Sequence, residues 1–327
     1  MWWSTVGILV ALTLSVLAAP GAVQAQPAKV PRVGVLAVED SGAATPERIQ
    51  AEFREALRER GYVEGQNILV EYRGVTAGQT DRLNALAVEL VHLPVDLLVA
   101  LPTPAAHAAK RATLVIPIVF NAGDPVGTGL VASLARPGGN ATGVGGIAAE
   151  LGGKCLDLLR ELLPTVTPIA ALVHATDPFA QPFLEQIEAA ARSSGVRVHS
   201  VVVRGAEELD GAFAAMVQAQ VGAVILQPIL ASSRAATLAM QHHLPAITSS
   251  ELFAEAGGLM TYAANRASRW RSTATYVDKI LKGAKPADLP VERPSKFDLI
   301  INLKTAKALG LTIPPTLLFQ ADGTGSV

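Results

Sequence analysis

The run PRVGVLAVED, residues 31–40, returns later in the chain as PIAALVHATD, residues 168–177. Each run is an apolar segment that ends in acidic or hydroxyl residues, which is typical of a buried strand with a polar carboxyl end. The correspondence continues beyond these runs, because residues 31–123 match residues 168–251 as an internal duplication. The sequence therefore predicts two halves with one architecture.

Within each half, apolar strands alternate with helical patterns. QAEFREALRERGYVEGQNILVEYRG (50–74) matches EQIEAAARSSGVRVHSVVVRG (185–205), and VDLLVALPTPAAHAAKRATLVIPIVF (95–120) matches VGAVILQPILASSRAATLAMQHHLPAIT (221–248). Short strands rich in Val, Ile and Leu between helices indicate parallel sheets covered on both faces. The predicted fold class is α/β, with two doubly wound Rossmann-like lobes. Ligands bind outside the carboxyl ends of such strands, so two facing lobes would form a cleft.

The duplication also predicts how the chain divides. We expect a signal peptide at 1–25, an N-terminal lobe at 26–145, a C-terminal lobe at 146–262, and a segment at 263–327 that crosses the hinge and completes the lobes. Hinge crossings are expected near 141–149, near 252–265 and after about 290. The pattern at 266–283 predicts an amphipathic helix. Which lobe it joins is open at this point, as it is for the strand FDLIIN that follows.

Composition excludes several classes of protein. Half of the 327 residues are apolar and 17% are charged, which excludes a disordered chain. The formal net charge of −1 and the absence of a basic run argue against a nucleic-acid partner. Cys155 is the only cysteine, so an intramolecular disulfide is impossible and stability must come from packing.

The N-terminus is typical of a secretory signal. An apolar core runs from Val6 to Ala19, and Val23-Gln24-Ala25 offers small residues for cleavage after Ala25. The core is short for a spanning helix and is interrupted by Pro20 and Gly21, although an uncleaved anchor is the alternative. We therefore expect a periplasmic protein.

Polar residues gather at the predicted strand ends. In the first half these are Glu39, Asp40, Ser41, Thr103, Asn121 and Asp124, and in the second Thr176, Asp177, Gln227, Ser249, Ser250 and Glu251. Three of them precede a proline, as Thr103-Pro104, Asp124-Pro125 and Asp177-Pro178, which is a signal for the start of a helix.

These strand ends suggest an amino-acid-like ligand. A helix start capped by Thr103 suits a ligand carboxylate, because free N–H groups and the positive helix end point outward there. Asp124 and Glu251 would suit a ligand ammonium group. A zwitterion satisfies both kinds of site, whereas plain helix capping is the alternative for any single residue. Phe120, Phe179, Phe253 and Tyr262 either line the cleft or pack in the core.

The chain carries no convincing sign of catalysis. GTGLVA (127–132) fits a loose dinucleotide fingerprint, but residues 121–126 separate it from the preceding strand and Asp124 would repel a pyrophosphate. The six histidines show no metal-binding spacing, and no nucleophile elbow is present. Cys155 lies in an amphipathic helical pattern. We expect no enzyme activity, no metal and no cofactor.

Four long motifs carry a resemblance: FREALRERGYVEGQNILVEYR (53–73), GDPVGTGLVASLARPGGNATG (123–143), EAGGLMTYAAN (255–265) and the run from Lys279 to Leu318. Together they resemble the substrate-binding family of ABC transporters whose characterised branch binds tryptophan or other aromatic amino acids, over about residues 31–318.

The resemblance implies a type I periplasmic-binding-protein fold. It also implies that the protein delivers a small ligand to a membrane permease. By position, the family's cleft segments fall on Thr103 and Pro104, 121–124, 174–177, Gln227, and 249–251 with Tyr262. The chain departs from the family pattern at His174-Ala175, where Asn-Pro is frequent, and at Ala263, where glycine is usual.

We therefore expect an extracytoplasmic binding protein that acts as a monomer, closes around a small polar ligand and meets ABC permease subunits transiently. An extracytoplasmic sensor module is the first alternative function. A secreted enzyme with a nucleotide-type lobe is the second.

Overall fold

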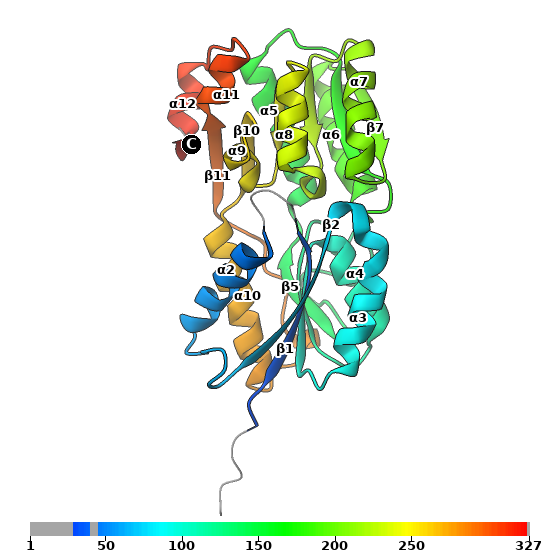
Figure 1. The fold of residues 1–327 in the computed structure, drawn as a ribbon, viewed down its shortest axis with the longest axis vertical. Coiled ribbons are helices and arrows are strands. Elements are labelled where there is room, and N and C mark those ends of the chain that lie inside the picture. Colours follow the sequence, from blue (N-terminus) through cyan, green and yellow to red (C-terminus); the bar gives the residue numbers. More distant parts are fainter. Residues whose placement is uncertain (1–28, 40–44, 326–327) are drawn as a thin grey trace, which may run out of the picture. The chain divides into compact units, whose positions relative to one another are not determined.

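The computed structural model describes residues 29–39 and 45–325. The predicted signal peptide, Asp40 and Ser41 lie outside the described residues. Residues 31–327 form one compact unit, in which two lobes are joined by crossing segments (Figure 1). No helix in the described part of the chain combines the length and apolar character needed to span a bilayer.

The first lobe is built on a five-stranded parallel sheet of order β2-β1-β3-β4-β5. Its elements are β1 (Arg32–Glu39), α2 (Pro46–Arg58), β2 (Leu69–Thr76), η1 (Ala77–Arg82), α3 (Leu83–His92), β3 (Leu97–Leu101), α4 (Thr103–Ala112), β4 (Ile118–Ala122) and β5 (Ala141–Gly145). The helix α2 is amphipathic and buries Ile49, Phe53 and Leu57 on one face.

The second lobe has a seven-stranded sheet of order β12-β11-β10-β9-β8-β6-β7. Its elements before the last crossings are α5 (Ala148–Leu162), β6 (Ile169–His174), α6 (Ala180–Ser194), β7 (Val198–Val203), η2 (Ala206–Glu208), α7 (Leu209–Gln218), β8 (Ala223–Leu226), η3 (Pro228–Leu230), α8 (Ser233–Gln241), β9 (Ala246–Thr248), α9 (Leu252–Glu255) and β10 (Met260–Ala264). The order β7-β6-β8-β9-β10 repeats the order β2-β1-β3-β4-β5 of the first sheet. The predicted α/β fold with two parallel-sheet lobes is therefore confirmed.

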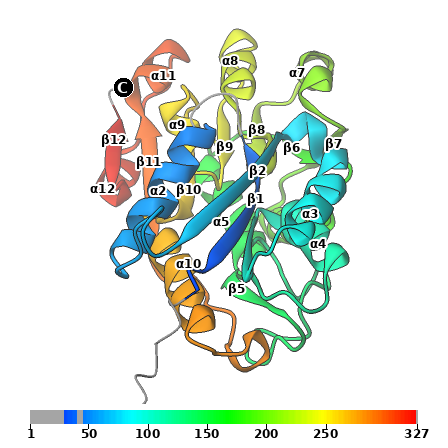
Figure 2. The ribbon, with the colours of Figure 1, turned by 60° about the horizontal axis from the view of Figure 1, so that its bottom comes forward.

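The lobes exchange helices where their matching strands end. After β5 the chain enters α5, which packs in the second lobe against β6 and α6. After β10 it enters α10 (Arg266–Leu281), which returns to the first lobe and packs against α2, with the rings of Phe53 and Trp270 5.6 Å apart. Figure 2 shows α2 and α10 on one side of β1 and β2, with α3 and α4 on the other. The open question about residues 266–283 is thus answered in favour of the first lobe.

The last segment returns to the second lobe through η4 (Pro286–Asp288), β11 (Phe297–Asn302), α11 (Leu303–Ala308), α12 (Pro315–Gln320) and β12 (Gly323–Gly325). Strand β11 pairs antiparallel to β10, which is the one departure from the predicted parallel pairing among the described strands. The reason is the direction of the chain, because β10 leaves the second lobe at its cleft edge and β11 enters it there.

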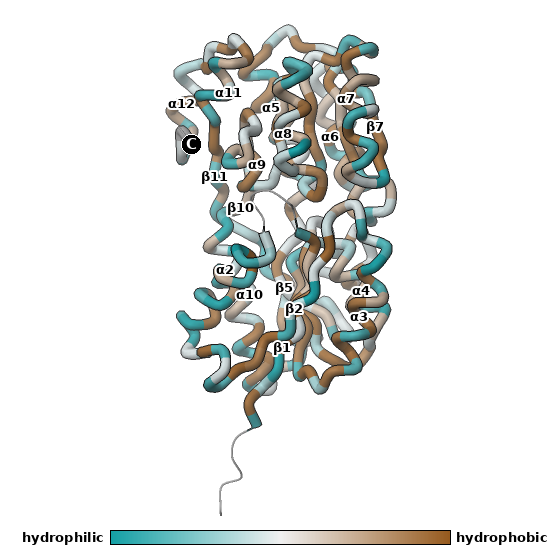
Figure 3. Tube along the Cα trace, viewed as in Figure 1, coloured by the Kyte–Doolittle hydropathy of each residue, from teal (hydrophilic) through white to brown (hydrophobic). Residues whose placement is uncertain are grey.

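Burial follows the layers. The central strands β6 and β8 are buried along their whole length, whereas the edge strand β7 is largely exposed. Figure 3 shows apolar segments concentrated in the strands and hydrophilic ones on surface helices such as α2. Cys155 is fully buried in α5, and burial raises the pKa of its thiol to about 12, so it has the properties of a packing residue.

Of the predicted helix starts, the one at Asp124-Pro125 is wrong and the one at Asp177-Pro178 is displaced by two residues. Asp124-Pro125 leads into a series of turns without a helix, because Asp124 Oδ1 accepts a hydrogen bond from the backbone N–H of Gly127 at 2.8 Å and closes a local turn. Asp177 Oδ1 likewise accepts from the N–H of Phe179 at 2.9 Å, and α6 begins only at Ala180.

The crossing strand β5 depends on close backbone approach. Gly143 has φ of +153°, and a methyl group there would overlap the carbonyl oxygen of Phe120 in β4. We expect Gly143→Ala to lower the free energy of unfolding by more than about 3 kcal/mol, because neither backbone can move away within the sheet. Denaturant unfolding measures this loss.

Gly211→Ala is the matched control, because Gly211 lies exposed in α7 with open space around its Cα. It should raise stability by about 0.5 to 1 kcal/mol through helix propensity. Equal effects of the two substitutions would contradict the close approach in β5.

Candidate functional site

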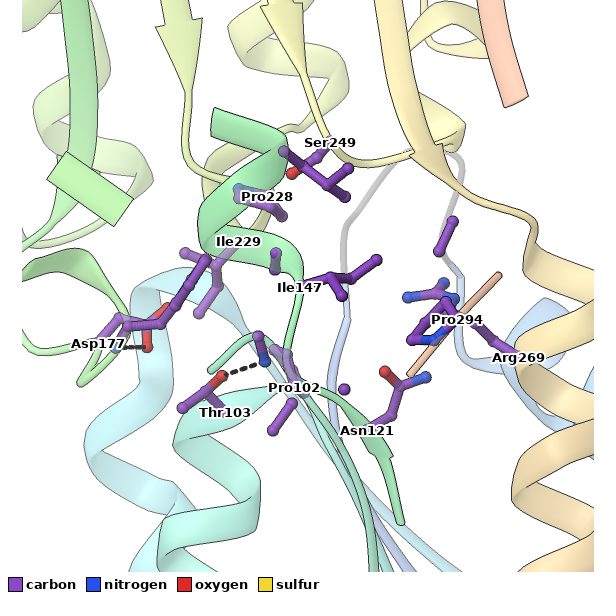
Figure 4. Close-up of a pocket in the computed structure, with 17 residues that line it drawn as sticks. Pro102, Thr103, Asn121, Ile147, Asp177, Pro228, Ile229, Ser249, Arg269 and Pro294 are labelled. Atoms are coloured by element: carbon purple, nitrogen blue, oxygen red, sulfur yellow. Dashed lines mark hydrogen bonds between the residues drawn. The ribbon is translucent and has the colours of Figure 1, made fainter. Parts of the chain in front are cut away.

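The carboxyl ends of the two sheets face each other and enclose a cavity with walls from both lobes (Figure 4). Its polar lining residues are Thr103, Asn121, Asp177, Ser249 and Arg269. Its apolar wall includes Pro102, Ile147, Phe179, Pro228, Ile229 and Pro294. Ile147 lies on the crossing from β5 to α5, and Arg269 lies in the first turns of α10, so both helix exchanges place residues in this cavity.

A second chamber adjoins this cavity on the side of α2 and α10. Asn121, Ser249 and Arg269 line both spaces. The additional lining residues of the second chamber include Glu39, Ile49, Leu101, Ser250, Glu251, Leu252, Arg266 and Trp270. The two spaces together can hold a ligand with polar ends and an apolar middle.

Asp177 is a buried carboxylate without a cationic partner among the described residues. Only 6% of the residue is exposed. Its Oδ2 accepts from Gln227 Nε2 at 2.7 Å, and Gln227 Oε1 accepts from the backbone N–H of His174 at 2.7 Å. Loss of hydration raises the pKa of Asp177 to about 7, although the hydrogen bond from Phe179 opposes this shift.

Glu251 is already paired. Its Oε1 accepts a hydrogen bond from Arg269 Nη2 and lies 3.6 Å from Arg266 Nη1. Arg266 Nε in turn donates to Glu52 Oε2 at 2.5 Å. Glu251, one of the two residues predicted to receive a ligand ammonium group, is therefore already paired with two arginines of α10.

Ionic and polar contacts join the lobes on both sides of the cavity. Arg48 of α2 donates to both carboxylate oxygens of Glu255 in α9, at 2.6 and 3.3 Å. On the opposite flank the hydroxyl oxygens of Thr80 and Thr176 lie 3.5 Å apart. The lobes are thus in contact around the cavity as well as through the crossings.

The structure brings most of the predicted residues to the cleft. Thr103, Asn121, Asp177 and Ser249 line the main cavity, Ser250 and Glu251 line the adjoining chamber, and Pro104 and Thr176 line a pocket between η1 and η2. Gln227 is fully buried behind Asp177 and positions its carboxylate.

Besides Gln227, two predicted residues line none of these spaces. Asp124 bonds its own loop through Gly127. Tyr262 stacks on Phe297, with ring centroids 5.8 Å apart, and packs against the core of the second lobe. Of the other predicted aromatic residues, Phe179 lines the cavity, whereas Phe120 and Phe253 are fully buried in the cores.

Thr103 does not cap α4 as predicted. The helix begins at Thr103 itself, and the Thr103 hydroxyl accepts from the backbone N–H of Gly123 at 3.0 Å. It therefore joins the end of β3 to the end of β4. This bond fixes the floor of the cavity, where Asn121 and Gly123 lie.

Sequence reasoning missed Arg266, Arg269, Ile147 and Ile229. The first three follow β10 and β5, which occupy matching positions in the two sheets. If the alignment of the two halves is extended past residues 123 and 251, β5 and β10 also match. The segments that follow them would then have been predicted to line the cavity. The described residues contain no group of three or more His, Cys, Asp or Glu side chains placed to hold a metal ion.

Comparison with known proteins gives consistent matches along the chain. A family model described as ABC transporter substrate binding protein matches residues 35–324. A tyrosine-binding protein of Clostridioides difficile (strain R20291) is 27% identical over 263 residues, which are 79% of this chain and 75% of that protein.

Two solved structures extend these matches. A conserved domain protein from Vibrio cholerae has a TM-score of 0.82 and 26% identity, over 91% of this chain and 100% of that one. An ABC domain in complex with L-Trp from Streptococcus pneumonia has a TM-score of 0.79 and 28% identity, over 89% of this chain and 99% of that one.

The pKa of Asp177 predicts a pH dependence of stability. Its folded pKa of about 7 is above the ordinary value of 3.8, so the folded protein holds a proton that the unfolded chain releases. The resulting stabilisation is complete below about pH 4 and is lost as the pH rises through about 7, with a slope of up to about 1.4 kcal/mol per pH unit.

Asp177→Asn should lack this slope, so the difference between the unfolding free energies of the two proteins should change by up to about 1.4 kcal/mol per pH unit between pH 4 and 7. The Asn amide would face the Gln227 amide and add a destabilisation that does not depend on pH. Parallel stability curves for the two proteins between pH 4 and 7 would show that Asp177 has an ordinary pKa.

Proposed function

The chain belongs to the family of ABC transporter substrate-binding proteins, as its sequence motifs indicated, and from this premise we propose that it captures an aromatic amino acid between its lobes for import. The observation that carries the proposal is the cavity itself. Ionisable groups of opposite sign, Asp177 and Arg269, lie on opposite sides of it, and the apolar side chains of Ile147 and Ile229 lie between them (Figure 4).

This arrangement favours a ligand with an apolar body and polar ends. Apolar contact with Ile147, Phe179 and Ile229 suits a planar ring, whereas a sugar would need hydrogen-bond partners along its whole edge. The names of two relatives agree with this preference, because one is a tyrosine-binding protein and another is a complex with L-Trp.

In the proposed mechanism the ligand stabilises the closed lobes and the permease opens them. Residues that line the cavity belong to both lobes, so a ligand that contacts Asn121 and Ser249 together favours the closed form. The three crossings, after β5, after β10 and before β11, would act as the hinge. We propose that the mature protein works in the periplasm as a monomer after removal of residues 1–25, without a cofactor.

A thermal-unfolding screen tests the proposal. The ligand-free protein is heated with each amino acid, with sugars, with nucleosides and with small anions. L-Trp or L-Tyr should raise the melting temperature most, since a ligand at 100 times its Kd adds about 2.7 kcal/mol to the free energy of unfolding. Stabilisation by a sugar or a nucleoside, without an effect of aromatic amino acids, would contradict the proposed ligand class.

A matched pair of variants tests whether the ligand binds in the cavity. Ile229→Ala should weaken aromatic amino-acid binding by about 1 kcal/mol, roughly fivefold, because it removes apolar contact. Leu114→Ala, at a residue that is 81% exposed, should leave the Kd unchanged. Isothermal titration calorimetry measures both, and identical Kd values for the two variants would place the ligand elsewhere.

A further inference from the structure

Three buried polar atoms at the α10 end of the cleft have no hydrogen-bond partner among the described residues. They are Nε of Arg269, Nη2 of Arg266 and Oγ of Ser249. A polar group that is removed from water and left unbonded is costly, so such groups are few in folded proteins. All three belong to residues that line the chamber beside α10, and Arg269 and Ser249 also line the main cavity. Acceptor atoms of a ligand in these spaces are the partners that such groups lack.

The two arginines are held in place by their other nitrogens. Arg269 Nη2 donates to Glu251 and Arg266 Nε donates to Glu52, so the unbonded N–H groups of both residues have fixed directions. Fixed N–H donors from guanidinium groups are the usual partners of a carboxylate, and bonds of this kind are about twice as strong as those between neutral groups.

Two carboxylates line the same chamber and bear on its charge. Glu39 lies against Gly74 in β2, so close that no side chain would fit at Gly74. Glu251 uses Oε1 for both arginines, and its Oε2 has no hydrogen bond to a described residue. The chamber therefore offers N–H and O–H donors beside the open oxygen of Glu251 and the carboxylate of Glu39, which is the complement of a carboxylate next to an ammonium group.

We propose that this end of the cleft holds the amino-acid head of the ligand, with its α-carboxylate on Arg269 Nε, Arg266 Nη2 and Ser249 Oγ and its ammonium group facing Glu251 Oε2. The inference rests on the proposed function and assigns the orientation of the ligand. The side chain then crosses the main cavity between Ile147 and Ile229 and ends near Asp177, on the opposite side in Figure 4.

This orientation gives Asp177 a role in ligand selection. Its carboxyl group faces the far end of the ligand, where a phenol O–H or an indole N–H can donate a hydrogen bond. Phenylalanine has no such donor and would leave the buried carboxyl without a ligand partner. The site therefore selects L-Tyr and L-Trp over L-Phe.

The experiment compares L-Trp with L-tryptophanamide, which keeps the ammonium group and the ring but lacks the negative charge. Calorimetry on the full chain should show L-Trp binding at least about tenfold more tightly than the amide. In Arg269→Gln this ratio should fall to about threefold or less. Ser249→Ala should reduce it by a smaller factor, and Arg269→Lys should restore part of it.

Arg271→Gln is the matched control, because Arg271 lies on the same helix but is exposed and pairs with Glu59. It should leave both Kd values unchanged. Because Ser249→Ala breaks none of the ion pairs, it keeps the test valid if Arg269→Gln folds poorly. The ratio of the two Kd values, and not either alone, distinguishes a carboxylate contact from a general loss of lobe closure.

Three results are informative beyond the expected one. If L-Trp binds but its preference over the amide survives in Arg269→Gln and Ser249→Ala, the assigned orientation is wrong and the proposed function stands. If Asp177→Asn removes the preference for L-Trp over indole-3-propionate, the ammonium group lies at Asp177 and the orientation is reversed. If no aromatic amino acid binds the unaltered chain, both proposals fail.

Discussion

Everything in this molecule depends on the direction of its strands. In a parallel sheet all carboxyl ends lie at one edge, so the loops that can hold polar groups collect there. This chain builds two such sheets with the same strand order and sets their carboxyl edges against each other. The cavity is a consequence of this arrangement, because each loop that leaves a strand must turn at the boundary between the lobes.

Helix exchange converts two similar lobes into one binding unit. Since β5 and β10 end at the cleft, the shortest path for each following helix leads into the opposite lobe. The crossings therefore form cavity walls, and in the proposed mechanism they are also the hinge. Arg269 shows the effect clearly, because it is carried by a helix that packs on the first lobe but is paired with Glu251 of the second lobe.

Local pattern was enough to predict the repeated strands and helices, because burial on both faces leaves long apolar runs such as those around Leu98 and Leu172. It also located Thr103, Asn121, Asp177 and Ser249, since each follows or ends a buried strand. It failed at Asp124, where the Gly127 N–H captures the carboxylate within the loop. It missed Arg266 and Arg269, because helical periodicity does not say which lobe a crossing helix will join.

The cavity is also where charged side chains with unpaired polar atoms lie. Most of the charged residues around it are paired, as Arg48 is with Glu255 and Glu251 is with both arginines, so the closed lobes carry little unpaired charge at their contact. Asp177 and the open N–H groups of Arg266 and Arg269 are the exceptions. These groups come from both lobes, so a solute can bond to all of them only when the lobes are closed. In the proposed mechanism, binding and closure are then a single equilibrium, in which the free energy of each new hydrogen bond favours the closed lobes.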